Sequence, residues 1–292
     1  MAMRIVLAIL LTITACTAET VAEDLNCLTE AEQAASKLYA HLQAEAYEAL
    51  DRRAEAYEEL KTPEQIAAYQ QKLRRLMTMQ LGGFPEKTPL NARTVGTIEA
   101  DGYRIEKVIF DSQPQHRITA NLYLPNAAGK VPAIAVSSGH SRTAKTADYN
   151  QRFGISMAKH GMAALCFDPI GQGERSQILT AEGHPQHNGT TTEHFLIGVG
   201  STLVGRNTAR YRVWDAMRAI DYLVSRPEID ATKIGFTGCS GGGTLTSYVM
   251  ALDDRVACAA PACYLTTFRH LVETIGPQDA EQNIFGQLKF GL

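Results

Sequence analysis

The sequence lacks the features that mark several specialised classes of protein. It contains no basic run, no ligand spacing typical of a zinc site and no low-complexity tract. Its formal net charge is −3 and its pI is about 6.3. This balance gives no electrostatic reason to expect nucleic acid as a partner, and we expect neither a cofactor nor a metal. Hydrophobic residues make up 45% of the chain and charged residues 20%, which is ordinary for a globular protein.

Cysteine is too sparse and too widely spaced for a dense disulfide framework. Four of the six cysteines lie in or beside apolar, strand-like runs, so we expect buried free thiols. A bridge between the last two stays open if the compartment is oxidising. The six residues are Cys16, Cys27, Cys166, Cys239, Cys258 and Cys263.

The first residues have the pattern of an export signal. Arg4 supplies a positive charge, and residues 5–15 form an apolar stretch that is broken only by threonines and is too short to span a bilayer. Cleavage after Ala22 predicts an ordinary signal peptide over residues 1–22. Alternatively, Cys16 ends a segment that resembles a bacterial lipobox, which predicts a lipid anchor to the membrane. Either pattern predicts an exported protein that is periplasmic, lipid-anchored or secreted.

A helical extension over residues 23–85 follows the signal. Residues 28–49 carry one apolar stripe at spacings of three and four, and Thr29 with Glu32 forms a candidate capping box. Pro63 marks the first turn of a second helix that ends near residue 79.

Residues 86–292 have the pattern of an α/β domain. Three β-rich segments predict an antiparallel meander, and later apolar runs alternate with helical segments, which predicts a mostly parallel central sheet. A long polar stretch runs to about residue 207. The expected strands are 94–98, 103–110, 118–124, 131–136, 163–167, 233–237 and 256–263, with helices at 150–160 and 213–224.

Ser240 lies in a Gly-x-Ser-x-Gly motif over residues 238–242. A short apolar strand precedes the motif and a helix start of small residues follows it, which is the strand–turn–helix context of a nucleophile elbow. Gly238 and Gly242 suit this position because the strained serine leaves little room for neighbouring Cβ atoms. The sequence therefore predicts Ser240 as the nucleophile of an α/β-hydrolase fold.

Two backbone N–H groups are expected to bind the oxyanion that such a serine creates. Gly241 follows the nucleophile and lies at the positive end of the next helix. The second donor should come from the loop after the third strand of the fold, which here is residues 137–142. Either His140 or Ser141 can supply it. The side chain of His140 is open to an active-site role or to bonding within the loop.

Three segments carry a more specific resemblance. They are Gly139-His140-Ser141 with Lys145, Asp168-Pro169-Ile170-Gly171-Gln172-Gly173-Glu174, and Gly238-Cys239-Ser240-Gly241-Gly242-Gly243. Together they resemble the acetyl xylan esterase-like branch of the α/β-hydrolase superfamily, over residues 80–292. The resemblance implies hydrolysis of carboxylic esters on small molecules or polysaccharide, with deacetylation of polysaccharide as the expected reaction. Glucuronoyl esterases and prolyl-oligopeptidase-like peptidases share enough of the pattern to remain alternatives.

The expected acid and base are not recognisable in the usual order of serine, acid and histidine. His270 is the only histidine after Ser240 and follows the strand at 256–263 too closely. Asp253 and Asp254 lie directly behind the elbow helix and are expected to help end it. Glu273 and Asp279 are weak candidates for the acid.

Two interpretations follow from this gap. In the first, the last strands are missing because the chain is a fragment of a serine esterase, which has little activity alone and exposes a sheet edge that promotes association. In the second, the chain is complete and is a non-catalytic exported binding protein. A metal site at His184, His187 and His194 is conceivable, but a solvated loop is the expected structure there.

Overall fold

The computed structural model describes residues 27–292, apart from residues 36, 188, 275 and 278. Contacts between residues divide the chain into two compact units, Met1–Leu42 and Gln43–Leu292. The expected signal peptide and the lipobox Cys16 lie outside the described residues, and the domain boundaries at residues 22 and 85 stay predictions. Among the described helices, none combines the length and the apolar character that a membrane span needs.

Helices at the start of the chain form as the capping signals predict. The first unit contains α1 (Glu30–Ala35) and the beginning of α2 (Leu38–Glu58). Ahead of α1, the N–H of Thr29 donates to the carboxylate of Glu32 and the N–H of Glu32 donates back to the Thr29 hydroxyl. In the second unit, α3 (Pro63–Gln80) begins with a complete capping box between Thr62 and Gln65. Both caps agree with the sequence, but the single helix expected over residues 28–49 is divided into α1 and α2, and α2 continues to Glu58.

The second unit is built on a seven-stranded mixed sheet in the order β1-β2-β3-β5-β4-β6-β7. The β1–β2, β2–β3 and β3–β5 pairs are antiparallel, whereas β5, β4, β6 and β7 run parallel to one another. This confirms the meander followed by a parallel sheet. The strands are β1 (Arg93–Ala100), β2 (Tyr103–Gln113), β3 (His116–Pro125), β4 (Val131–Ser137), β5 (Ala163–Phe167), β6 (Ile229–Cys239) and β7 (Val256–Ala262).

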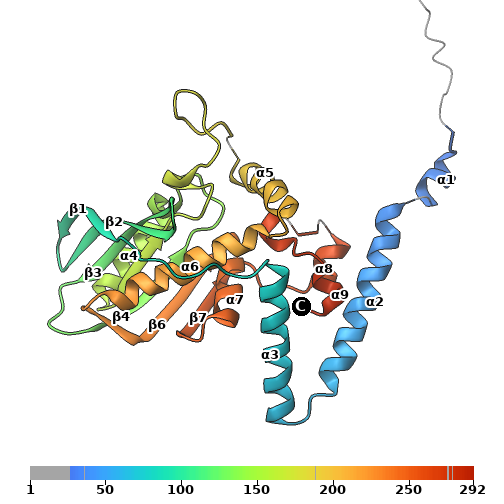
Figure 1. Ribbon diagram of the computed structural model, residues 1–292, viewed down its shortest axis with the longest axis horizontal. Coiled ribbons are helices and arrows are strands. Elements are labelled where there is room, and N and C mark those ends of the chain that lie inside the picture. Colours follow the sequence, from blue (N-terminus) through green and yellow to red (C-terminus); the bar gives the residue numbers. More distant parts are fainter. Residues whose placement is uncertain (1–26, 36, 188, 275, 278) are drawn as a thin grey trace, which may run out of the picture. The chain divides into compact units, whose positions relative to one another are not determined.

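Helices cover both faces of this sheet (Figure 1). In β4, Ala133 and Ala135 point into the larger core, which α6 (Thr208–Ser225) and α7 (Gly241–Leu252) complete. Ile134 and Val136 point the other way, into a smaller core shared with α4 (Asp148–Lys159). The alternation is the two-residue period of a strand that is buried on both faces.

The polar stretch before residue 207 is more ordered than its composition predicts. It contains α5 (Thr190–Leu203) and the 3-10 turn Gly173–Arg175, so the expectation of an extended polar segment is wrong. Other short elements are the 3-10 turn Ala144–Thr146, α8 (Phe268–Glu273), the 3-10 turn Ala280–Gln282 and α9 (Gln287–Phe290).

Cys166, Cys239, Cys258 and Cys263 are free thiols, so the optional bridge between the last two does not form. Only part of the expectation of burial is confirmed. Cys166 is buried, whereas Cys258 and Cys263 are exposed and Cys239 is intermediate. The exposure has a topological cause, since β7 lies at the edge of the sheet and most of its residues are exposed.

Candidate functional site

Ser240 occupies the turn between β6 and α7. Its φ is 57° and its ψ is −120°, a region that residues with a side chain rarely adopt. The N–H of Ser240 donates to the carbonyl of Ala262 in β7, and its carbonyl accepts from Thr244 in α7. The neighbouring strand and helix therefore impose the strained conformation, and the serine itself is exposed.

Close backbone packing explains the glycines of the motif. A Cβ on Gly238 would lie 2.5 Å from the carbonyl oxygen of Ser137, and one on Gly242 would lie 2.2 Å from the same oxygen. Real Cβ atoms do not approach oxygen so closely, so the elbow can press against the end of β4 only when both positions are glycine.

The loop after β4 rests directly on the elbow. A Cβ on Gly139 would be 2.5 Å from the carbonyl oxygen of Cys239 and 3.4 Å from the Cβ of Ser240. The buried side-chain amide of Gln172 holds this loop by donating to the carbonyls of Gly139 (2.7 Å) and Ser141 (2.9 Å). The N–H of Gly173 donates to the carbonyl of Arg142 in the same loop, so the Asp-Pro-Ile-Gly-Gln-Gly segment holds the loop that rests on the elbow.

The hydrogen bonds of this loop distinguish the two candidates for the second oxyanion donor. The N–H of Ser141 donates to the carbonyl of Gly139 at 2.7 Å. Within the described residues, the N–H groups of His140 and Gly241 donate to no backbone carbonyl. The geometry therefore favours the N–H groups of Gly241 and His140 over that of Ser141.

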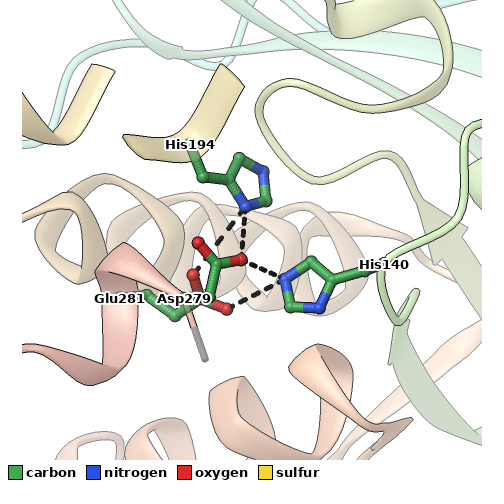
Figure 2. A group of neighbouring side chains, drawn as sticks. All are labelled: His140, His194, Asp279 and Glu281. Atoms are coloured by element: carbon green, nitrogen blue, oxygen red, sulfur yellow. Dashed lines mark hydrogen bonds and ion pairs between the residues drawn. The ribbon is translucent and has the colours of Figure 1, made fainter. Parts of the chain in front are cut away.

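The side chain of His140 connects the elbow to a buried cluster (Figure 2). Its ring packs on Gly241, and its Nε2 atom contacts the carboxylates of Asp279 and, at 3.3 Å, Glu281. Burial alone would lower the pKa of His140, but Asp279 and Glu281 stabilise the protonated ring and raise its pKa to about 9.

His194 completes the cluster from α5. Its Nδ1 atom lies 2.7 Å from Oδ2 of Asp279, and its Nε2 atom lies 2.8 Å from the carbonyl oxygen of Ile170. The side chains of His194 and Asp279 are fully buried, and that of Glu281 is 2% exposed. The contacts with His140 and His194 outweigh the effect of burial and hold the pKa of Asp279 well below its usual range.

The three histidines that were considered as one metal site, His184, His187 and His194, have different environments in the structure. His194 is buried in a helix, so the expectation of a solvated loop is wrong for this residue. His184 is exposed and His187 is partly exposed, and neither takes part in the cluster. His270 and Glu273 lie exposed in α8, outside it.

The acidic candidates also separate. Asp253 is the C-cap of α7 and accepts hydrogen bonds from Arg255, which agrees with its expected role at the end of that helix. Of the two weak candidates for the acid, Asp279 is the one that enters the cluster. Glu281 carried no signal in the sequence, and its position becomes informative only once the fold brings it to His140.

No histidine within the described part of the chain is hydrogen-bonded to the Ser240 hydroxyl. His140 lies nearby, but its Nε2 atom faces the carboxylates of Asp279 and Glu281. The described site thus contains a strained serine and two candidate oxyanion donors, without a base bonded to that serine.

Comparison with known proteins identifies the family. The family model described as acetyl xylan esterase (AXE1) matches residues 58–291, which is more than half of the chain. The chain belongs to the acetyl xylan esterase (AXE1) family. Among curated relatives of this AXE1 member, YtaP of Bacillus subtilis (strain 168), described as a candidate hydrolase, is 24% identical over 212 residues. The match covers 69% of this chain and 66% of YtaP.

Solved structures agree on the fold of this AXE1 chain. BF1801 of Bacteroides fragilis NCTC 9343, described as a candidate acetyl xylan esterase, has a TM-score of 0.70 at 18% identity, covering 87% of this chain and 70% of BF1801. Methylesterase BT1017 has a TM-score of 0.58 at 21% identity, covering 83% of this chain and 52% of BT1017. The sheet and its elbow therefore form an α/β-hydrolase fold. The chain spans about two thirds of the length of YtaP and about half of that of BT1017.

Proposed function

We propose that this chain is a serine carboxylic-ester hydrolase that forms an acyl-enzyme at Ser240, with acetylated polysaccharide as its substrate class. The observation that carries the proposal is the strained, exposed Ser240 between β6 and α7. A binding surface alone has no need for a serine in a backbone conformation that costs on the order of 1–3 kcal/mol.

The first half of the reaction follows from the geometry. The Ser240 hydroxyl attacks the ester carbonyl and loses its proton to water, and the oxyanion that forms accepts hydrogen bonds from the N–H groups of Gly241 and His140. When this tetrahedral intermediate collapses, the C–O bond to the alcohol breaks, the alcohol leaves with a proton from water, and the acyl group stays on Ser240. The positive end of α7 lies at the same place and favours the developing negative charge. Gln172 keeps the His140 loop in position for this step.

The proton of Ser240 has no acceptor among the described side chains, so we expect slow turnover. Enzymes that lose a member of the catalytic triad keep a residual acceleration of about 10³–10⁴ over water from the oxyanion hole and substrate binding. A rate in this range, rather than that of a complete triad, is the expectation for the 292-residue chain.

Acetyl esters are proposed because the family model is that of acetyl xylan esterases. One structural neighbour, BT1017, is named a methylesterase, so a related sheet also occurs in a protein named for methyl esters rather than acetyl esters. Acetyl and methyl esters therefore need to be compared directly.

The test compares wild-type chain with S240A on p-nitrophenyl acetate, acetylated xylan, a methyl glucuronate ester and a chromogenic peptide. The proposal expects acetate release that S240A lacks, and a preference for acetyl esters. If wild type and S240A had equal rates on every substrate, the esterase proposal would be wrong and the interpretation as a non-catalytic binding protein would remain. Faster cleavage of the methyl ester or the peptide would identify a glucuronoyl esterase or a peptidase instead.

Export is a second part of the proposal and rests on residues 1–22 alone. Cleavage after Ala22 would release the protein to the periplasm or the medium, whereas processing at Cys16 would attach it to lipid. Mass analysis of the mature N-terminus in a bacterial host distinguishes the two. An unprocessed Met1 on cytosolic protein would contradict export.

A further inference from the structure

The cluster of His140, His194, Asp279 and Glu281 is built like a metal site, and we propose that it binds one divalent cation with a preference for Zn²⁺. One ligand atom from each residue lies within 4.8 Å of the other three. Two imidazoles and two carboxylates are donors that Zn²⁺ accepts. This set could not be predicted from the sequence because His140, His194 and the pair Asp279 and Glu281 lie in three distant segments of the chain.

The outer atoms of three of these residues are already bonded. The Oδ1 atom of Asp279 accepts from the N–H of Ala280 at 2.6 Å, and the Oε1 atom of Glu281 accepts from Arg212 at 2.6 Å. The Nε2 atom of His194 faces the carbonyl of Ile170, which can only accept, so this nitrogen carries a proton. Metal ligands are oriented in the same way by partners on their outer atoms.

The inner atoms, by contrast, lack partners that suit them. Because the Nε2 atom of His194 is bonded on the outer side, its Nδ1 atom is the one that faces inward, 2.7 Å from Oδ2 of Asp279. Oε2 of Glu281 is buried without a hydrogen bond, and Nε2 of His140 contacts both carboxylates but makes no hydrogen bond of acceptable geometry to either. A buried carboxylate oxygen without a hydrogen bond destabilises the folded protein, and a shared cation would satisfy it.

The spacing of the inner atoms suits a tetrahedral ion. Zn²⁺ binds nitrogen and oxygen at about 2.0–2.2 Å, which places its ligands about 3.4 Å from one another. Nδ1 of His194 lies 2.7 Å from Oδ2 of Asp279 and 3.8 Å from Oε2 of Glu281, which brackets this spacing, and Nε2 of His140 is in closer contact with the same Oδ2 atom. The ion would fill its four positions with protein atoms, as in a structural site.

Such an ion would join three segments that meet beside the elbow: the loop after β4, helix α5 and the turn at residues 279–281. Because His140 packs on Gly241, the ion would fix the backbone around the oxyanion donors. Its role is therefore to position His140, and it does not depend on whether the chain hydrolyses esters.

The test measures Zn²⁺ binding rather than activity. The full chain, purified without metal-affinity chromatography, should contain about one Zn²⁺ per molecule by elemental analysis. After removal of metal, competition with a coloured chelator gives the Zn²⁺ affinity of wild type, H194Q and E281Q. Loss of outer partners alone weakens metal sites about 10–100-fold, so removal of a ligand should weaken Zn²⁺ binding by at least about 100-fold.

H187Q is the matched control, because His187 is partly exposed and lies outside the cluster. It should bind Zn²⁺ as wild type does. Replacement by Co²⁺ gives a second measurement, since a tetrahedral site of nitrogen and oxygen ligands produces strong visible absorption. If H194Q fails to fold, E281Q and the Co²⁺ spectrum of wild type still decide. Wild-type chain that binds no Zn²⁺ in the chelator competition, or an equal loss in H187Q, would overturn the proposal and leave protonated His194 as the partner of Asp279.

Discussion

Gly241 lies against the imidazole ring of His140. A Cβ added to Gly241 would be 2.5 Å from Cε1 and 2.8 Å from Nε2 of that ring. The residue that follows the nucleophile therefore fixes the place of His140, whose own N–H is the second candidate oxyanion donor. This contact joins the elbow to the buried cluster. A substitution in the elbow should therefore displace His140, and a change in the cluster should displace the elbow.

G241A tests this contact. The added methyl group must displace the ring of His140, and a misplacement of about 1 Å in an active site can cost about 10²-fold in rate. We expect acetate release from p-nitrophenyl acetate to fall to nearly the S240A rate. G129A is the matched control, because nothing lies within 4 Å of a Cβ at Gly129. Equal rates for G241A and wild type would show that the ring position does not matter.

Asp215 should make the fold sensitive to acid. It is buried beside Arg175, at 2.7 Å, and near His116. Burial alone would raise the pKa of Asp215, but Arg175 and His116 lower it to about 2. Because the pKa in the folded protein is below the ordinary value of 3.8, this stabilisation is present above pH 3.8 and is lost as the pH falls through 2.

D215N removes this charge and leaves Arg175 buried without its partner. The free energy of unfolding, measured with urea at neutral pH, should fall by about 3–5 kcal/mol. The difference in free energy of unfolding between wild type and D215N should become smaller as the pH falls from 4 toward 2. D254N, which breaks the exposed pair with Arg74, should have a much smaller effect. A difference in free energy of unfolding that stays constant across this pH range would contradict the low pKa of Asp215.

The outer edge of β7 should promote self-association. No described strand pairs with that edge, and Ala257–Ala260 are exposed. Unpaired apolar edges recruit further strands, and a lysine on the edge opposes this. We expect light scattering after size exclusion to show dimers or larger species that A259K reduces. A127K, on a loop, should leave them unchanged. A strictly monomeric wild type at high concentration would contradict this expectation.

The elbow could be predicted from the sequence because its causes are local. The apolar strand, the serine and the glycines that allow close packing are adjacent along the chain, and so are the capping residues of α3. The antiparallel meander and the mostly parallel sheet after it also followed from the alternation of strands and helices.

The buried cluster could not be predicted because its contacts are distant in the sequence. His194 meets Asp279 across 85 positions, and α5 has little helical propensity because it contains three threonines at its start and two glycines. Packing supplies what propensity lacks: a Cβ on Gly198 would come within 3.1 Å of both Ala280 and Thr208, so glycine lets the helix approach closely. Glu281 can be recognised as part of the cluster only from its tertiary contacts.

The most direct test of the central claim is to look for an acyl group on Ser240. The chain would be incubated with p-nitrophenyl acetate, quenched in acid and digested, and the peptides analysed by mass spectrometry. The account predicts one acetyl group on the peptide that contains Ser240, and its absence from S240A. An unmodified Ser240, or acetylation only at other residues, would contradict the claim that this serine is the nucleophile.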